Sequence, residues 1–376
     1  MKPIDNKIFK SRFVRLVQYI FVSKKVTAIV VGSLLLTTIA SIFIVSSVLN
    51  NSSKAQSASK NTSTTTPPVG SGSASSNNQT TTNAQSSKTS SSSLKAKPFG
   101  FFALPGKTSS LTTRASLLGN SFIDGIVIPV GWADIEPSKG VYDFSSIDST
   151  LQLATNANKA ATIVVFTGKN SYPSWLGSSG VTFWTDQKGS TLIDPSSTAF
   201  APLWDQTIAE LGKHYDSNAT VRQVSMCGLT GTLCGPRFPE FPPNTTFDTL
   251  QSNWQSVINN YATAFPHTFL NLEVQSTQSH NADLPKNLFA SLPNSNIGPF
   301  ADYLSTNTPS LTLPSGQVFS QVKTDWCGFQ MVSPLGSSVG NAIAYGHTKF
   351  GCTYYEIYEG DVTNYGNLIA PLHSNL

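Results

Sequence analysis

The chain has 376 residues and a formal net charge of +4 at pH 7. The positive excess belongs to the amino-terminal end, because residues 98–376 carry 12 Lys and Arg against 19 Asp and Glu and therefore have a net charge of −7. The overall basic charge gives no support for nucleic-acid binding, and no phosphate-binding glycine motif follows the first apolar run, which argues against a nucleotide cofactor.

The amino-terminal end has the pattern of a membrane anchor. Residues 1–25 hold seven Lys and Arg against one Asp, and residues 26–49 then run without a charge. Such a run is long enough to cross a hydrocarbon core of about 30 Å, and it is longer than the apolar stretch of a cleaved signal peptide. Because the positive charges precede it, we expect a single-pass signal-anchor at 26–49 in the cell membrane, with 1–25 in the cytoplasm and the rest outside the cell.

Residues 50–97 are rich in Ser and Thr and contain no acidic residue. Such a composition buries too little apolar surface to fold, so we expect a disordered linker, which either spaces the following domain from the membrane or is a tail without that role. The remaining residues, 98–376, are close to the roughly 250 residues of a single (β/α)₈ barrel.

Eight short apolar runs alternate with helical patterns along residues 98–376, as expected for parallel strands joined by helices. The stronger runs are 99–104, 124–130, 161–166, 221–228 and 268–274, and the weaker ones are 317–323, 328–332 and 353–359. Apolar residues at three- and four-residue spacing predict helices at 198–216 and 247–265, and a shorter one at 340–351. Eight such strands predict one closed (β/α)₈ barrel, of α/β class.

All four cysteines lie in the later half of the chain, at positions 227, 234, 327 and 352. Outside the cell an even number of cysteines indicates disulfides, and four cysteines allow three pairings. We favour Cys227–Cys234, which closes a short loop, and Cys327–Cys352, because these two precede neighbouring barrel strands. A zinc site is the alternative, although the spacing contains no Cys-x-x-Cys pair.

The segment from Trp132 to Asp148, "WADIEPSKGVYDFSSID", resembles the loop after the second strand of TIM-barrel glycoside hydrolases, in the retaining clan of β-galactosidases and cellulases. "SYPSWL" (171–176) and "YYEIYEGDVTN" (354–364) are similar to other segments of these enzymes. The resemblance implies a glycoside hydrolase. It also implies that Asp134 and Glu136 are mainly structural and that Trp132 borders the sugar site.

The chain departs from that clan at both catalytic positions. The resemblance places a general acid as Asn-Glu after the fourth strand, but the first acidic residue there is Glu240. It places the nucleophilic Glu at the end of the seventh strand, where this chain has Gln330. An amide cannot attack the anomeric carbon as a carboxylate does, so any catalytic pair must lie elsewhere.

Several acidic residues remain near predicted strand ends: Glu240, Glu273, Asp325, Glu356, Glu359 and Asp361. We select Glu356 and Glu240 as the catalytic candidates. Glu356 shares one face of its strand with Tyr358, and an acid inside an apolar strand needs a partner such as those at a barrel mouth. The alternatives are a buried salt bridge of Glu356 with Arg222 or Arg237, and a solvated loop position for Glu240.

Aromatic rings near the strand ends favour a carbohydrate site, since sugar rings stack on them. The predicted substrate-binding residues are Trp132, Trp175, Trp326, Gln330 and Tyr358. Trp204 and Trp254 lie at helical spacing and are expected in the core.

The sequence thus predicts a membrane-anchored extracellular glycoside hydrolase that acts on an oligo- or polysaccharide. The alternatives are a non-catalytic carbohydrate-binding barrel that has lost the catalytic pair, and a structural surface protein without a ligand. We expect no cofactor and no metal, a carbohydrate partner, membrane contact through the amino-terminal helix, and a monomer.

Overall fold

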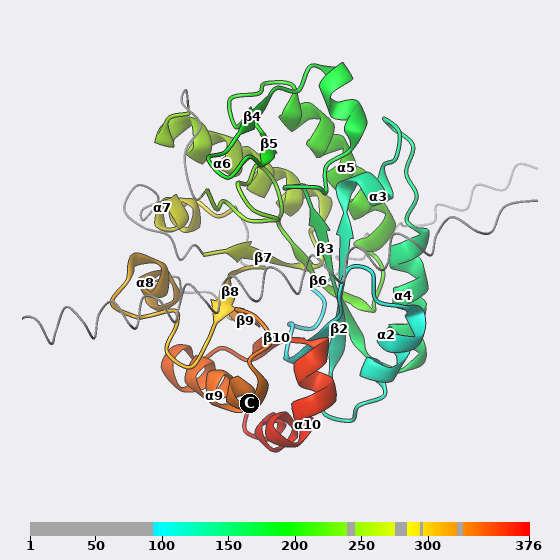
Figure 1. The fold of residues 1–376 in the computed structure, drawn as a ribbon, viewed down its shortest axis with the longest axis vertical. Helices are drawn as coiled ribbons and strands as arrows, with labels where there is room; N and C mark the ends of the chain where they lie inside the picture. The colour runs from blue at the N-terminus through cyan, green and yellow to red at the C-terminus, as the bar shows by residue number, and fades with distance from the viewer. Residues whose placement is uncertain (1–92, 239–244, 275–283, 294–295, 322–325) are drawn as a thin grey trace, which may run out of the picture. The chain divides into compact units, whose positions relative to one another are not determined.

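The computed structural model describes residues 93–238, 245–274, 284–293, 296–321 and 326–376 (Figure 1). These residues all belong to one compact unit, Ser87–Leu376. The predicted cytoplasmic segment, the predicted span at 26–49 and most of the predicted linker lie outside the described residues. In the part that is described, no helix has the length and apolar character needed to cross a membrane.

Eight parallel strands close into a barrel, as the sequence predicts (Figure 1). Around the barrel they follow the order β1-β10-β9-β8-β7-β6-β3-β2. Their bounds are β1 Gly100–Leu104, β2 Gly125–Gly131, β3 Ala160–Phe166, β6 Val221–Ser225, β7 Phe269–Glu273, β8 Ile297–Leu304, β9 Gly328–Met331 and β10 Tyr354–Tyr358. Nearly every strand residue is buried, because the strands contact side chains inside the barrel and helices outside it.

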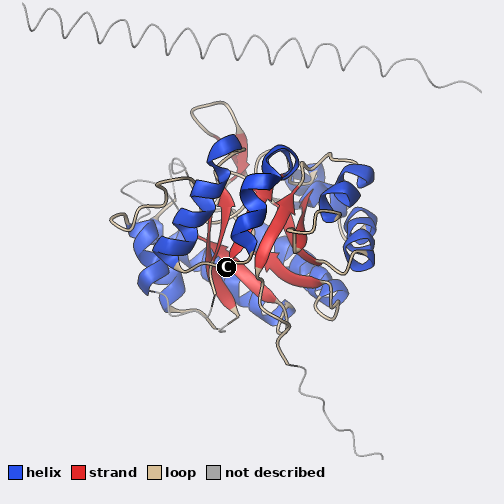
Figure 2. Cartoon of the chain, turned by 90° about the horizontal axis from the view of Figure 1, so that it is seen from below, coloured by secondary structure: helices blue, strands red, loops and turns tan. Residues whose placement is uncertain are grey.

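Helices surround the strands (Figure 2). The longer ones are α2 Leu111–Leu118, α4 Ser145–Asn156, α5 Phe200–Tyr215, α6 Phe247–Ala264, α7 Leu284–Ala290, α8 Pro314–Gln321, α9 Val339–Phe350 and α10 Glu359–His373. Short elements occupy the segments that follow β2, β3 and β9: α3 Trp132–Ile135, η1 Ser174–Ser179, η2 Gly336–Ser338, and a hairpin of β4 Phe183–Thr185 and β5 Thr191–Ile193. Helix α5 buries a stripe at helical spacing, including Leu203, Thr207 and Leu211.

The predicted sixth strand is wrong. Most of 317–323 lies in helix α8, and the sixth barrel strand is β8. Helix α8 buries Ser315, Gly316, Val318 and Phe319, a spacing that one side of a helix allows and a half-exposed strand does not. The true strand, "IGPFADYL", contains a proline and an aspartate. Both residues are rare in strands, so strand propensity does not predict this segment. Asp325, which the sequence placed near strand six, lies outside the described residues.

Both predicted disulfides are confirmed. Cys227 and Cys234 have Cα atoms 4.5 Å apart and close a loop directly after β6. Cys327 and Cys352 have Cα atoms 4.9 Å apart and join the segments that lead into β9 and β10. One disulfide therefore lies at the carboxyl end of the barrel strands and the other at their amino end.

The segment before β1 contacts the amino end of the barrel. The backbone N–H of Lys95 donates to the carbonyl of His267, and its ammonium donates to the Val221 carbonyl at 2.9 Å and to Thr268 Oγ1 at 2.8 Å. Burial lowers the pKa of Lys95 to about 8. Lys95 thus contacts the barrel, although the sequence analysis assigns residues 50–97 to the linker. The compact unit therefore begins before residue 98.

Candidate active site

A cavity of about 420 Å³ lies at the carboxyl ends of the barrel strands, and each of the eight strands contributes at least one lining residue. Active sites of (β/α)₈ enzymes occupy this end, because the loops that vary in sequence gather there. Three acidic side chains line the cavity: Glu273 from β7, Asp302 from the neighbouring strand β8, and Glu356 from β10, which β9 separates from β8.

Glu273 and Asp302 form one cluster with Arg237, which comes from the loop after β6. The Arg237 guanidinium donates to both Asp302 carboxylate oxygens, at 3.0 and 2.9 Å, and lies 3.7 Å from Glu273 Oε1. Glu273 is paired in register with Phe300, so Asp302 is two residues further along β8 on the same face. The chain thus brings together three residues from three separate segments.

The two carboxyl groups of this cluster both have raised pKa values. Burial and the negative charge of Asp302 raise the pKa of Glu273 well above its ordinary value. Burial also raises the pKa of Asp302, while Arg237 and a hydrogen bond from Glu273 oppose that rise. Arg237 thus favours the ionised form of Asp302, whereas burial and the Asp302 charge favour the protonated form of Glu273. Among the described residues, no donor bonds to the buried Oε1 of Glu273.

Glu356 occupies the opposite side of β9 from Asp302 and is fully buried. Its Oε1 accepts a hydrogen bond from Tyr354 at 2.7 Å, and the Tyr354 hydroxyl lies 2.8 Å from Thr162 Oγ1. Burial raises the pKa of Glu356 to about 8, and the Asp302 charge adds to this effect, whereas the Tyr354 hydrogen bond opposes it. The raised pKa favours the protonated form of Glu356 at neutral pH, and Arg237 favours the ionised form of Asp302 on the other side of β9.

Gln330 and Tyr358 line the same cavity as Glu356, and Gln330 Nε2 donates to the Tyr358 hydroxyl at 3.2 Å. The predicted strand alternation, which placed Glu356 and Tyr358 on one face, agrees with this arrangement. Arg237 pairs with Asp302 and Glu273, so the salt bridge from Glu356 to Arg237, which the sequence left open, is not formed.

Comparison with known proteins gives matches to glycoside hydrolases. The profile of a family described as β-galactosidase matches residues 121–224. The catalytic domain of β-amylase from Paenibacillus polymyxa aligns with a TM-score of 0.53 and 12% identity, over 70% of this chain and 93% of that one. Xylanase 10B from Thermotoga petrophila aligns over 69% of this chain and 82% of that one, with a TM-score of 0.49 and 11% identity. No curated protein matches the sequence.

The chain resembles the TIM-barrel glycoside hydrolases. The resemblance predicted from the sequence is confirmed, at low sequence identity. The similarity to the β-amylase domain shows the fold, and the profile match covers β2, β3 and the segments around them.

Within this resemblance, the predicted role of Trp132 is wrong. Its ring is fully buried between Trp175, Phe200 and Trp204, and its indole N–H donates to Glu136 Oε2 at 2.7 Å. No face of this ring is left for a sugar. The Trp-x-x-Ile-Glu-Pro segment places it in the core because α3 begins directly at the end of β2.

The other two predicted tryptophans also lie away from the cavity. Trp175 is half-buried on η1, packs edge-on against Trp132 and donates to the Glu136 carbonyl at 2.9 Å. Trp326 precedes β9 and packs against Phe269 and Tyr354 at the amino end of the barrel. A position before a strand and a position after it face opposite ends of a parallel barrel, which is why Trp326 is far from the mouth.

Glu136 has the structural role that the sequence expects. Its carboxylate accepts hydrogen bonds from the Trp132 indole, from Thr207 at 2.7 Å and from the Gly140 backbone at 2.8 Å. These donors come from α3, α5 and the turn before α4, so Glu136 joins three segments. Asp134 caps α3 and forms a salt bridge with Lys107 at 2.7 Å.

The second predicted catalytic residue, Glu240, lies outside the described residues, on the loop after β6. The described part of that loop passes directly over the acid cluster. At Gly235 the backbone has a φ of +58°, and a Cβ there would lie 2.0 Å from Glu273 Oε2. Only glycine permits this approach. Over the described ranges, no group of three or more His, Cys, Asp and Glu side chains is arranged to hold a metal ion.

Sequence reasoning missed Asp302 and Arg237 as site residues and named Glu273 only as one of several acids. The signal for Asp302 was available: a single aspartate with apolar and aromatic neighbours, in a run that Pro299 made an unlikely strand.

Proposed function

We propose that this protein hydrolyses O-glycosyl bonds in the cavity at the carboxyl end of the barrel. The observation that carries the proposal is geometric: the carboxyl groups of Glu273, Asp302 and Glu356 line one cavity at the carboxyl ends of the strands, and Arg237 binds Asp302 through two hydrogen bonds. Glycoside hydrolysis needs one carboxylic acid and one carboxylate beside the bond that breaks.

In the proposed reaction Glu356 donates its proton to the glycosidic oxygen as the bond from that oxygen to the anomeric carbon breaks. Asp302 accepts a proton from the water whose oxygen bonds to the same carbon. Arg237 holds Asp302 in place through two hydrogen bonds, and the unbonded Oε1 of Glu273 can accept a sugar hydroxyl. The alcohol and the free sugar leave, and proton exchange with solvent restores both carboxyl groups.

The proposed stereochemical outcome is inversion. Glu356 and Asp302 lie on strands separated by β9, and neighbouring strands are about 4.8 Å apart, so the two backbones are roughly 10 Å apart. Carboxyl groups of inverting enzymes are separated by about 6.5–9.5 Å, whereas those of retaining enzymes are about 5–5.5 Å apart. Gln330, at the position of the retaining nucleophile, agrees with a mechanism that uses no nucleophile on that strand.

The test is turnover by the full chain, solubilised in a detergent without a sugar head group, on a panel of aryl glycosides and natural oligosaccharides. We expect hydrolysis of at least one substrate, with the inverted anomer formed first as seen by proton NMR. Asp302→Asn should lower kcat/KM by about 10²–10⁴-fold. Glu210→Gln, at a half-buried position of helix α5 whose carboxylate pairs with Lys213, should leave it unchanged. Binding of an oligosaccharide without turnover across the panel would instead support the non-catalytic carbohydrate-binding barrel.

We also propose that the barrel is anchored in the cell membrane and lies outside the cell. The uncharged run at 26–49, with seven basic residues before it, supports this topology. The pairing of all four cysteines agrees with an oxidising compartment. Protease added to intact cells should release a soluble barrel fragment, whereas full protection of the protein would contradict the topology.

A further inference from the structure

The cavity at the carboxyl end has two chemically different walls. The strands β7 to β10 provide the polar wall, which consists of Asn271, Glu273, Asp302, Gln330, Glu356 and Tyr358. The strands β1 to β3 and the loop after β6 provide the apolar wall, which consists of Leu104, Pro105, Pro129, Val164, Phe166, Met226 and Leu233. The exceptions are Phe300 on the polar side and, on the apolar side, the charged groups of Lys107 and Arg237 and the hydroxyls of Ser225 and Thr232. Both charged groups pair with an aspartate, Lys107 with Asp134 and Arg237 with Asp302.

The strand order makes this division a property of the whole barrel. Strands β1, β2 and β3 are contiguous in the closed sheet, and so are β7, β8, β9 and β10. In an eight-stranded ring, β3 lies opposite β9 and β2 lies opposite β8. Val164 therefore faces the strand of Gln330 across the cavity, and Pro129 faces the strand of Asp302. A ligand between them contacts acids and amides on one side and hydrocarbon on the other.

Leu233 extends the apolar wall to the mouth of the cavity, where it is 48% exposed. The position is fixed, because the backbone N–H groups of Thr167 and Gly168 donate to the Leu233 carbonyl at 3.1 and 3.2 Å, and the Cys227–Cys234 disulfide closes its loop. A Cβ at Gly168 would lie 1.8 Å from the Thr232 carbonyl oxygen, so this contact requires glycine. The chain thus holds an aliphatic side chain in water at the entrance.

We infer that the substrate is a glycoside with an apolar aglycone, either an alkyl or an aryl group. The sugar lies against the acids and the aglycone lies along the apolar wall and over Leu233. This inference rests on the proposed function for the sugar, and on the two walls for the aglycone. The apolar wall contains one aromatic ring, Phe166, among aliphatic residues and prolines, so it suits a hydrocarbon chain better than a stack of sugar rings.

The test compares binding of methyl and hexyl glycosides of glucose and galactose, both anomers, to the full chain by titration calorimetry. The ligands stay below the concentrations at which they form micelles, and the detergent has no sugar head group. Since each buried methylene favours binding by about fourfold, partial burial of the chain should make hexyl glycosides bind at least about tenfold more tightly than methyl glycosides. Val164→Thr and Leu233→Thr should each reduce that ratio.

Val332→Thr is the matched control, because Val332 is similarly exposed at the end of β9 but does not line the cavity; its hexyl-to-methyl ratio should stay at the wild-type value. Equal affinity for methyl and hexyl glycosides would overturn the inference, as would a ratio that Val164→Thr and Leu233→Thr leave unchanged. Chain-length-dependent binding without turnover of any glycoside would support the inference and contradict the proposed function. Turnover with no dependence of binding on the aglycone would support the proposed function and contradict the inference.

Discussion

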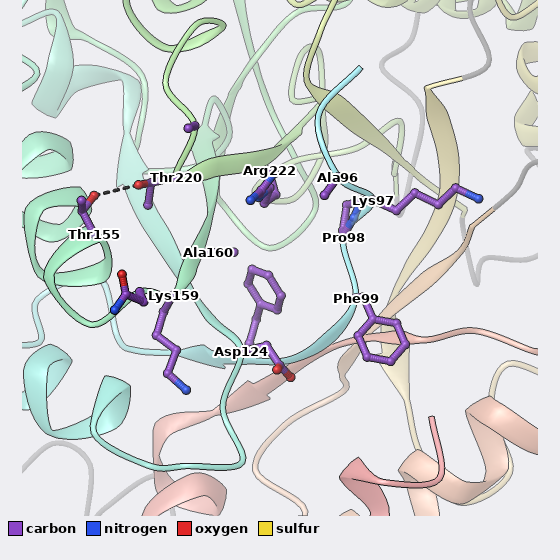
Figure 3. A pocket seen from close by; sticks show the side chains of 13 residues that line it. Ala96, Lys97, Pro98, Phe99, Asp124, Thr155, Lys159, Ala160, Thr220 and Arg222 are labelled. Carbon is purple, nitrogen blue, oxygen red and sulfur yellow. Dashed lines mark hydrogen bonds between the residues drawn. The ribbon is translucent and has the colours of Figure 1, made fainter. Parts of the chain in front are cut away.

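The barrel has a cavity of about 420 Å³ at each end, and the two differ in chemistry rather than in size. The amino-end cavity is lined by Asp124, Lys159 and Arg222, with residues 96–99 along one side (Figure 3). Its charged groups have local partners: Asp124 bonds to His373 at 2.8 Å and to the Phe101 backbone at 2.8 Å, and Lys159 donates to the Ile123 carbonyl.

The carboxyl-end cavity is instead lined by three carboxyl groups, two of which, Glu273 and Asp302, lie beside the Arg237 guanidinium. Burial and the charge of Asp302 raise the pKa values of Glu273 and Glu356, which favours their protonated forms. Burying carboxyl groups in this way lowers the stability of the folded protein. Acids with perturbed pKa values in a cleft are typical of active sites. Cavity volume therefore does not distinguish the candidate active site from the amino-end cavity, whereas the acidic residues that line the carboxyl-end cavity do.

The largest expected effect is that of Glu356→Gln at the carboxyl end. The amide keeps the shape and the Tyr354 hydrogen bond but has no proton to give the leaving group, so kcat/KM should fall by about 10²–10⁴-fold with KM little changed. Steady-state kinetics on the best substrate of the panel measures this. A fully active variant would show that another group is the acid.

Trp132→Ala should destabilise the protein by about 3–5 kcal/mol, because it empties a buried site between Phe200 and Trp204 and leaves Glu136 without one donor. The sequence predicted weaker sugar binding instead. Urea unfolding of Trp132→Ala and of Trp132→Phe, which keeps a ring, distinguishes the two roles. Unchanged stability with weaker glycoside binding would restore the predicted role.

The two disulfides provide a direct comparison of the two ends. Replacing Cys327 and Cys352 by Ser should lower the free energy of unfolding by about 2–4 kcal/mol and leave kcat/KM of the folded protein unchanged. Replacing Cys227 and Cys234 should also lower kcat/KM, because their loop leads into Arg237, which positions Asp302. If both double variants lose activity equally, the disulfide at the amino end also contributes to activity, which would contradict this prediction.

The pH dependence should follow the acid at the carboxyl end. Glu356 is protonated in the folded protein up to a pH of about 8, so activity should fall about tenfold per pH unit above that value. The raised pKa also means that the folded protein holds a proton which the unfolded chain releases above its ordinary value of 4.5. Stability from this group is therefore complete below 4.5 and is lost as the pH rises through about 8.

Glu356→Gln should flatten this part of the stability profile, and thermal unfolding between pH 4 and pH 9 measures it. A variant with the same pH dependence as the wild type would assign the proton to another group.

The smallest effect is expected at the amino end. Arg222→Gln alters a residue that lines the amino-end cavity without contacting the acid cluster, so kcat/KM should change within about twofold and stability within about 0.5 kcal/mol. A large loss of activity would show that the amino-end cavity takes part in the function, and the comparison of the two ends would then fail.

Local pattern by itself determined much of this protein. Buried parallel strands need β-branched and apolar runs, so the sequence predicts seven of the eight barrel strands. Their number also predicts the closed barrel. The short loop between Cys227 and Cys234, and the positions of Cys327 and Cys352 beside neighbouring strands, predicted the two disulfides. The alternation along β10 placed Glu356 and Tyr358 on one face. Hydrogen bonds within its own segment, from the Trp132 indole and the Gly140 backbone, explain the position of Glu136 without a ligand.

Only the tertiary structure decided which side chains meet. Arg237, Glu273 and Asp302 come from three segments, and no local pattern relates them; their proximity arises because β6, β7 and β8 are adjacent in the closed barrel. Burial decided that Trp132 belongs to the core and that Glu356 holds its proton. The physical reason is that periodicity reports one element at a time, whereas desolvation and charge depend on every element packed around a group.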